Sequence, residues 1–407
     1  MSAKLCAAAG MVALVASAAS AMPMYDIIDL GLVNATDIGV QGNAVSPNGI
    51  YATGRGFGAP TTSFLYSQVG GMASLPNDPS RGFGVGNGVN DAGIVAGTGA
   101  TTSFGSSPLP LIWQSGAVAQ LPLPAGETLG RANDINNNNL AVGSVNGGSL
   151  ERASYYTTTT GTTITATGPG GVLMTTAYGV NDAGIACGNG IDPNNAARNV
   201  GLRYDINTAQ LTEIGALPGL NGALAFGISE AGHITGSSML NQGSGTPFVW
   251  TSGGGMVAIP LPTGATSGSG RGVNSSGWCV GNAGGVFAVP WLYDGVQTYR
   301  VQDLIPAGSG WDLSMNTSSS ALGISDDGVI VGTGIHNGNT RAYMMVPIVP
   351  CPGDADGDRD VDLTDLNLVL FNFGNVVTPG TNGDVDGDGD VDLTDLNLVL
   401  FNFGNVC

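Results

Sequence analysis

Two acidic segments near the C-terminus hold the residues best suited to chemistry. Residues 353–376 and 383–406 have the same sequence except at two positions, and each places aspartates at positions 1, 3, 5, 9 and 12 of a loop. Calcium takes about 6–8 oxygen ligands, which such a loop supplies together with the backbone carbonyl at position 7. The sequence therefore predicts two calcium sites. Their ligands are Asp354, Asp356, Asp358, Asp362 and Asp365 with the carbonyl of Asp360, and Asp384, Asp386, Asp388, Asp392 and Asp395 with the carbonyl of Asp390.

The two loops differ at position 6, where the first has Arg359 and the second has Gly389. This position takes a positive φ in calcium loops, which glycine adopts freely and which costs another residue roughly 1–2 kcal/mol. We therefore expect the first site to bind calcium more weakly than the second. Magnesium suits these loops less, because it prefers few protein oxygens and keeps part of its water shell.

A predicted helix follows each loop, and its apolar residues fall on more than one side. Leu368 and Phe371, with their copies Leu398 and Phe401, point away from the main apolar stripe. They predict a docking patch, and burial against the other repeat or the rest of the chain is the alternative. The main stripe predicts a small core and consists of Leu366, Val369, Leu370 and Phe373 with residues 396, 399, 400 and 403.

The pattern D-x-D-G-D-x-x-V-D-x-x-D-L, found twice over 353–406, resembles type I dockerin. The resemblance implies a small α-helical calcium-binding domain that docks onto a cohesin-like or other surface protein, and dockerins usually accompany polysaccharide-degrading proteins. It also implies docking through loop positions 10 and 11 and the following helix. Here Leu replaces the usual Ser or Thr at position 10, and Phe replaces the expected basic residue on the helix. The implied partner-binding residues are Leu363, Thr364, Leu393 and Thr394, beside the two apolar pairs.

The cysteines and the N-terminus indicate secretion. Lys4, an apolar run and small residues ending at Ala21 are typical of a signal peptide over 1–21, with a retained helix as the alternative. No later stretch is apolar enough to span a bilayer, so we expect an extracellular protein. Cys351 and Cys407 bracket the acidic tail, and we predict a disulfide between them because a secreted chain allows one. Cys187 and Cys279 are expected to be separate core thiols.

The chain before the tail contains seven copies of a hairpin motif, G-(V/I)-(N/S)-x-x-G-x-x-x-G or a close variant. Four short strands per ~45 residues are typical of a propeller blade. We therefore predict a mainly β protein with a seven-bladed β-propeller over 22–350 and a small helical domain over 351–407. The spare strand Tyr25 to Gly31 is expected to complete the seventh blade, beside Ala342 to Met345; a β-solenoid is the alternative. The Asn or Ser of each motif lies at 46, 90, 136, 181, 229, 274 and 325.

The hairpins, the Asp29-Leu30-Gly31 strand and Arg341-Ala342-Tyr343 resemble the HAF-type extracellular repeats of bacterial secreted proteins. This resemblance covers about 25–350. It implies secretion and a propeller-like fold, and it implies no known activity.

Composition and motifs favour a binding protein over an enzyme. The chain has 30 acidic and 11 basic residues, so nucleic acid is excluded as a partner. No nucleophile or phosphate-loop motif occurs, and His233 and His336 are isolated in the sequence. We predict a secreted, non-catalytic interaction protein whose propeller is a recognition platform. The alternative is a carbohydrate-active protein that binds a glycan or acts as a glycoside hydrolase or polysaccharide lyase, because paired carboxylates can be distant in sequence. Four recurring acids are assigned to turns rather than to acid–base pairs: Asp91, Asp182, Glu230 and Asp326.

Overall fold

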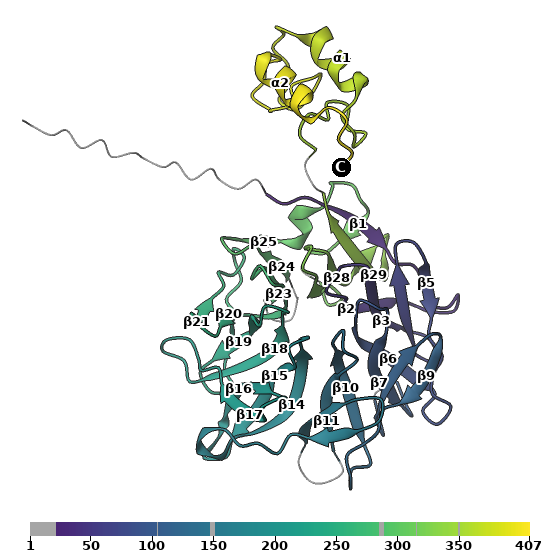
Figure 1. The fold of residues 1–407 in the computed structure, drawn as a ribbon, viewed down its shortest axis with the longest axis vertical. Coiled ribbons are helices and arrows are strands. Elements are labelled where there is room, and N and C mark those ends of the chain that lie inside the picture. The colour runs from purple at the N-terminus through teal and green to yellow at the C-terminus, as the bar shows by residue number, and fades with distance from the viewer. Residues whose placement is uncertain (1–21, 104, 147–150, 285–288, 315, 349–350) are drawn as a thin grey trace, which may run out of the picture.

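The computed structural model describes residues 22–103, 105–146, 151–284, 289–314, 316–348 and 351–407; the predicted signal peptide lies outside them. The described chain forms seven antiparallel sheets, six with four strands and one with five. The inner strand of each sheet contacts the inner strand of the next, and the last contacts the first, so the sheets are the blades of a closed propeller (Figure 1). This confirms the seven-bladed prediction and excludes an open solenoid.

The first four blades follow the repeat order of the sequence. Alternating apolar residues and glycine turns produce these short strands. Their strands are β2 (Val40–Val45), β3 (Tyr51–Gly56), β4 (Thr62–Ser67) and β5 (Gly71–Ser74); β6 (Phe83–Val89), β7 (Val95–Ala100), β8 (Leu109–Gln114) and β9 (Ala117–Gln120); β10 (Gly130–Ile135), β11 (Ala141–Val145), β12 (Arg152–Tyr156) and β13 (Gly161–Thr163); and β14 (Leu173–Val180), β15 (Ile185–Asp192), β16 (Asn195–Asp205) and β17 (Gln210–Glu213).

The last three blades follow the same plan, with two 3-10 turns, η1 (Pro169–Gly171) and η2 (Val301–Leu304), in the connections. In the seventh blade β26 and β27 both pair with β28. The strands are β18 (Gly222–Ile228), β19 (Ile234–Met239), β20 (Thr246–Thr251) and β21 (Gly255–Ala258); β22 (Gly268–Val273), β23 (Cys279–Ala283), β24 (Val289–Tyr293) and β25 (Thr298–Arg300); and β26 (Trp311–Asp312), β27 (Ser320–Ile324), β28 (Ile330–His336), β29 (Asn339–Pro347) and β1 (Tyr25–Asp29).

The N-terminal strand β1 closes the ring, as predicted. It is the outer strand of the seventh blade and pairs antiparallel with β29, from Tyr25 opposite Pro347 to Asp29 opposite Tyr343. The Asp29 carboxylate lies 2.7 Å from Nδ1 of His336, whose ring stacks on an indole of the same blade. These contacts give His336 a structural role in the seventh blade.

The hydrophobic core is divided among the interfaces between blades rather than gathered at one centre. Phe64 and Val40 of the first blade pack with Val331 and Met344 of the seventh, and equivalent clusters lie between the other blades. Cys187 and Cys279 are buried free thiols in two different clusters, which confirms their predicted separation.

The motif asparagines join neighbouring blades. Asn136 is 2% exposed; its Oδ1 accepts from the backbone of its own turn, and its Nδ2 donates to the carbonyl of Asn181 in the next blade at 2.8 Å. Asn90, Asn181 and Asn274 make the same bond to the next blade. Among the described residues, the side chain of Ser229 has only the hydrogen bond within its turn, which it accepts from the N–H of His233.

In the fifth blade, His233 makes the contact with the next blade that an asparagine makes elsewhere. Its Nδ1 lies 3.3 Å from the carbonyl oxygen of Asn274 in the next blade, where Ser229 cannot reach. The isolated histidine of the sequence thus has a structural role.

The recurring acids lie in turns, but their carboxylates accept hydrogen bonds from neighbouring blades rather than from their own turns. Asp91 accepts from the backbone N–H of Asn48 at 2.9 Å, and Asp182 accepts from Asn137 at 2.7 Å. Glu230 accepts from Asp182 and Asp326 from Ser275, each at 2.8 Å. These acids were predicted to stabilise their own turns, but the preceding Asn or Ser already caps each turn, so the acid is free to accept from a neighbouring blade.

The C-terminal segment contains α1 (Leu363–Asn372) and α2 (Leu393–Asn402), which follow the two acidic loops. The backbone that follows each helix accepts a hydrogen bond from the acidic loop of the other copy. The N–H of Val361 donates to the carbonyl oxygen of Asn405, and the N–H of Val391 donates to that of Asn375, each at 2.9 Å. A disulfide joins Cys351 to Cys407, as predicted. Neither helix of the described chain has the length and hydrophobicity needed to cross a bilayer.

The small core of this segment differs from the predicted stripe. Val361 and Val369 are fully buried with their copies, and Leu366 is partly buried. Leu370 and Phe373 are 52% and 47% exposed, so their assignment to the core was wrong. The loop valines fill the space between the helices that these two residues were expected to fill.

The asparagine contacts predict a graded loss of stability. Asn136→Ser keeps an acceptor for the turn and loses the bond to the next blade, so we expect a loss of about 1 kcal/mol in the free energy of unfolding. Asn136→Ala loses both, and we expect up to about 3 kcal/mol. Urea denaturation measures both values. An unchanged midpoint in Asn136→Ser would contradict the role of the bond between blades.

Candidate metal sites and the channel of the propeller

The structure brings three of the five predicted carboxylates together in each acidic loop. Asp354, Asp356 and Asp365 offer oxygen atoms within 4.8 Å of one another, as do their counterparts Asp384, Asp386 and Asp395. Asp365 and Asp395 are fully buried. Positions 1, 3 and 12 of each loop thus converge.

Positions 5 and 9 are held by local hydrogen bonds. Asp358 accepts from the N–H of Asp360 at 3.1 Å, and Asp362 caps α1 by accepting from Thr364 at 2.6 Å. The second loop repeats both contacts. The cap carboxylate of the first loop also lies within 4.8 Å of Asp360 and Asp365, in a second acidic group.

The chemistry of the loops fits a hard cation. Oδ1 of Asp360 is buried without a hydrogen-bond partner among the described residues. Desolvation and the neighbouring carboxylates raise the pKa of Asp356 and of Asp386. A divalent cation would satisfy the orphaned oxygen and offset the repulsion between these acids.

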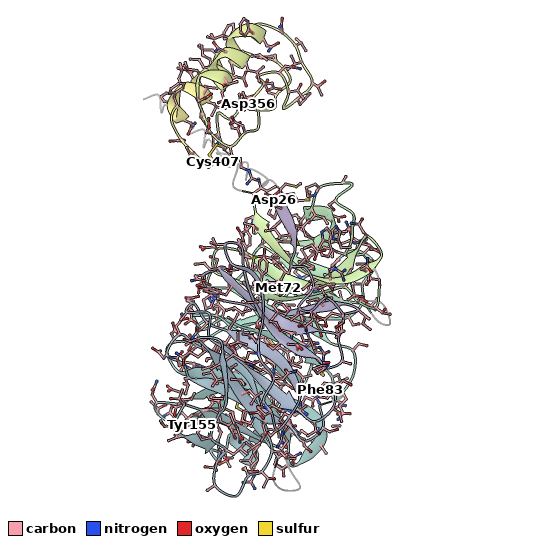
Figure 2. All side chains as sticks on the ribbon, turned by 90° about the vertical axis from the view of Figure 1, so that its right-hand side faces the viewer. Asp26, Met72, Phe83, Tyr155, Asp356 and Cys407 are labelled. Atoms are coloured by element: carbon pink, nitrogen blue, oxygen red, sulfur yellow. A yellow bond between two sulfur atoms is a disulfide. The ribbon has the colours of Figure 1, made fainter. Side chains whose placement is uncertain are left out.

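The backbone at loop position 6 has the predicted conformation. Arg359 has φ +74° and Gly389 has φ +99°. The guanidinium of Arg359 forms an ion pair with Asp26 of β1, so the first loop contacts the strand that closes the propeller. Figure 2 shows Asp26 at the edge of the propeller nearest the C-terminal segment.

The predicted docking residues differ in exposure. Phe371 and its copy are each 85% exposed, and Leu363 is 63% exposed, whereas Leu368 is partly buried. Leu363, Leu370 and Phe371 are spaced seven and eight residues apart, which places them on one helical face. The exposed apolar face is therefore centred on Phe371 rather than on Leu368. The remaining docking residues are placed as in the first copy, with Thr364, Leu393, Thr394 and Phe401 exposed and Leu398 partly buried.

A channel runs along the propeller axis, and sequence reasoning did not find its lining. Its wide mouth encloses about 430 Å³, and it continues inward through cavities of about 170 and 90 Å³ that share wall residues. One β-bulge in each inner strand supplies one side chain to the wall. These bulge residues are Asn43, Asn87, Asn133, Tyr178, Phe226, Arg271 and Leu322.

The bulge residues can be located in the sequence by their position relative to the hairpin motif. Each lies three positions before the Asn or Ser of its hairpin motif, as Asn87 precedes Asn90 and Arg271 precedes Asn274. The motif around them repeats, while the residue itself changes from amide to aromatic to cation. Bulges often redirect side chains toward functional sites.

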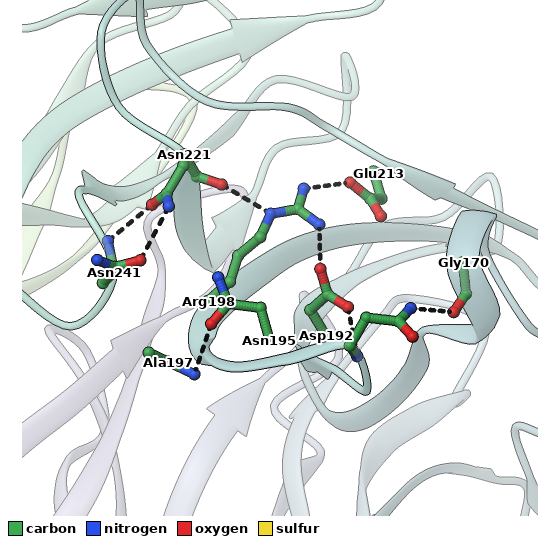
Figure 3. Close-up of polar contacts among 9 residues, drawn as sticks. Gly170, Asp192, Asn195, Ala197, Arg198, Glu213, Asn221 and Asn241 are labelled. Carbon is green, nitrogen blue, oxygen red and sulfur yellow. Dashed lines mark hydrogen bonds and ion pairs between the residues drawn. The ribbon is translucent and has the colours of Figure 1, made fainter.

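Arginines inside and outside the channel have different surroundings. Arg198 of β16 has ion pairs to Asp192 at 3.1 Å and Glu213 at 2.7 Å, and its Nε donates to Asn221 at 2.7 Å (Figure 3). This partnered group joins the fourth blade to the fifth and is structural. Arg271 has no hydrogen-bond acceptor among the described residues, and its Cζ lies 4.4 Å from the ring centre of Phe226.

The inner end of the channel is acidic. Asp134, Glu230 and Asp326 line its narrowest cavity. Burial raises the pKa of Asp134 to about 7, with a further contribution from Glu230, while the backbone N–H of Val180 opposes the rise. Burial and nearby carboxylates raise the pKa of Glu230 to about 7.

No protein-family model matches the chain, and comparison with curated proteins gives no match. Solved propeller structures resemble it at low identity. Oligogalacturonate lyase in complex with manganese is 11% identical, with a TM-score of 0.52 over 80% of this chain and 96% of that chain. Virginiamycin B lyase from Staphylococcus aureus is 13% identical, with a TM-score of 0.50 over 80% of this chain and 100% of that chain. TolB from Acinetobacter baumannii is 12% identical at a TM-score of 0.43 over 76% of this chain, which covers 63% of that chain. These likenesses show the fold alone.

The raised pKa of Asp134 predicts a pH-dependent loss of stability. Since an unfolded aspartate has a pKa of about 4, the contribution of Asp134 to the stability of the folded state is complete below that pH and is lost as the pH rises to about 7. Asp134→Asn removes this loss and keeps an acceptor for Val180. We expect its Tm to match the wild type at pH 4 and to exceed it at pH 8 by at least about 2–4 °C, the shift that 1 kcal/mol produces.

Thermal unfolding of the full chain in calcium measures this difference, and the exposed Asp327→Asn serves as the control. An equal gain at both pH values would show that the effect is not ionisation of Asp134.

Proposed function

We propose that the protein is a secreted, non-catalytic interaction protein. Its propeller is a recognition platform, and its C-terminal segment is a dockerin-like module that binds two calcium ions and docks onto a surface protein. The observation that carries this proposal is the pair of converging carboxylate clusters, each leading directly into a helix with an exposed apolar face.

Calcium would be held by the residues of the two loops. Asp354, Asp356 and Asp365 already converge in the first loop, and Asp360 and Asp362 stand beside them. The ion would supply positive charge among carboxylates that otherwise repel one another. The capped helices start at loop position 10, so the metal and the orientation of the helix are linked.

The two helices support a docking surface with two equivalent faces. Their sequences are identical over all ten residues, and the reciprocal backbone bonds between loops relate the two copies by an approximate half-turn. Leu363, Leu370 and Phe371 on one helix therefore have the same exposure as their copies. A partner that binds one face can bind the other after a half-turn.

A carbohydrate-active function is the second candidate. Asp134 and Glu230 line one cavity and have pKa values of about 7, which suits general acid–base chemistry. Against this, each accepts a hydrogen bond from a backbone N–H of the ring, which indicates a structural use. Hydrolase and lyase assays on polysaccharides, with Glu230→Gln as the comparison, test it.

Calcium binding is predicted to occur at two unequal sites. Calorimetry on the full chain should find the tighter site in the loop of Asp384 to Asp395, because Arg359 adopts its positive φ at a cost of roughly 1–2 kcal/mol. Arg359→Gly should tighten the first site by about tenfold. Equal affinities in the wild-type protein would refute the argument.

Docking is predicted to need calcium and the apolar faces. With a panel of cohesin modules and purified surface proteins as bait, capture should occur in calcium and be reversed by chelator. Phe371→Ser should reduce capture by no more than about twofold, because the second copy remains, whereas Phe371→Ser with Phe401→Ser should abolish capture while calcium uptake persists.

The matched control changes exposed apolar residues outside the helices, Val376 and Val406, to Ser. Capture that survives the double phenylalanine change would show that these faces do not dock, and the segment would then be a structural calcium clip.

A further inference from the structure

The channel mouth is chemically asymmetric although its backbone is repeated. The first three blades place the amides Asn43, Asn87 and Asn133 at their bulges, and the next two place Tyr178 and Phe226. The sixth blade places Arg271 and the seventh Leu322. The bulge itself is common to all blades, so the differences at this position are not required by the fold.

Two guanidinium groups face the mouth without a carboxylate partner among the described residues. The plane of Arg271 is supported by Phe226, and its N–H donors are open to the cavity. Arg55 donates only its Nε, to Gln41 at 2.9 Å. Outside the channel, Arg198 is fully paired. Unpaired cations in the mouth of an otherwise acidic protein point to an anionic ligand, and guanidinium groups bind carboxylates through two parallel hydrogen bonds.

The amide half presents hydrogen-bond acceptors. Nδ2 of Asn43, Asn87 and Asn133 donates to a backbone carbonyl of the next blade, at 2.8, 2.7 and 2.9 Å. Because a carbonyl can only accept, these bonds fix the orientation of each amide. Each Oδ1 is then left without a protein donor among the described residues. Three adjacent acceptors suit a ligand that carries several hydroxyl groups.

The aromatic half presents an apolar surface. The rings of Tyr178 and Phe226 are 5.5 Å apart at an interplanar angle of 72°. Aromatic side chains in pockets commonly pack against the apolar faces of ligands. The mouth encloses about 430 Å³, within the range of about 300–1,000 Å³ usual for small-ligand sites.

We propose that the mouth binds a carboxylate-bearing sugar, either a uronic-acid residue of an acidic polysaccharide or the free acid. Arg271 and Arg55 bind the carboxylate, the asparagine oxygens accept from the hydroxyl groups, and Phe226 packs against the ring. The acids at the inner end repel the carboxylate and keep it at the mouth. This ligand class rests on the proposed role of the propeller as a recognition platform.

Calorimetry on the full chain in calcium tests the proposal. The probes are galacturonate and glucuronate, as monomers and trimers, with the methyl-esterified galacturonate trimer as the neutral match. We expect the acid to bind at least tenfold more tightly than the ester. Arg271→Gln and Arg55→Gln should each weaken binding by about 10–100-fold, the effect of losing a hydrogen bond to a charged group.

Arg152→Gln, on the third strand of its blade, is the matched control and should leave the affinity unchanged. Arg271→Lys keeps the positive charge but loses the two parallel N–H donors of the guanidinium group, so it should give an intermediate affinity. This variant keeps the test valid if Arg271→Gln is unstable. A tighter trimer indicates a polysaccharide, and equal affinities indicate the free acid.

Three results would overturn the proposal: no binding of any acidic probe, equal binding of acid and ester, or unchanged binding in both Arg271 variants. None of these affects capture by the C-terminal segment, so a failure here is distinguishable from a failure of the docking proposal.

Discussion

The pairing of β1 with β29 is the contact on which the propeller depends, because it closes the ring. Each blade buries its apolar faces only against its neighbours, so an open array would expose one face at each end. β1 precedes the first blade in sequence and lies in the seventh, which joins the two ends of the array by backbone hydrogen bonds. The contact between Asp29 and His336 and the packing of Phe64 on Met344 reinforce the same junction.

Closure makes the repeat circular, so each inner strand has the inner strand of another blade on either side. Asn136 caps its own hairpin turn and also donates a hydrogen bond to the next blade. One residue therefore stabilises both the turn and the ring. The bulge three residues earlier adds a side chain without changing the path of the sheet. Because its backbone is fixed by its neighbours, this position can vary freely, and Arg271 and Asn133 occupy equivalent places with different chemistry.

Charge is distributed unevenly along the molecule: acidic groups gather in the two loops and at the inner end of the channel, and basic groups lie at the channel mouth. The two acidic loops gather carboxylates at positions 1, 3 and 12, and the inner end of the channel gathers Asp134 and Glu230. The mouth of the channel has instead two guanidinium groups, of Arg55 and Arg271, with no carboxylate partner in the part of the chain that the structure describes. Arg359 is the one basic residue of the segment 351–407, and it contacts Asp26 on the closing strand, so a metal loop and the ring junction share one ion pair.

Four features were predictable from the residues alone, because each follows from local spacing or from a repeat compared with itself: the number of blades, the strand that closes the ring, the Cys351–Cys407 bridge and the positive φ at position 359. Three other features became visible only in the folded protein. The turn acid Asp91 reaches a neighbouring blade, Leu370 is exposed while Val361 is buried, and seven bulge residues meet in one channel. These outcomes depend on which surfaces other segments cover and on side chains brought together from blades about 45 residues apart, which hydrophobic periodicity does not encode.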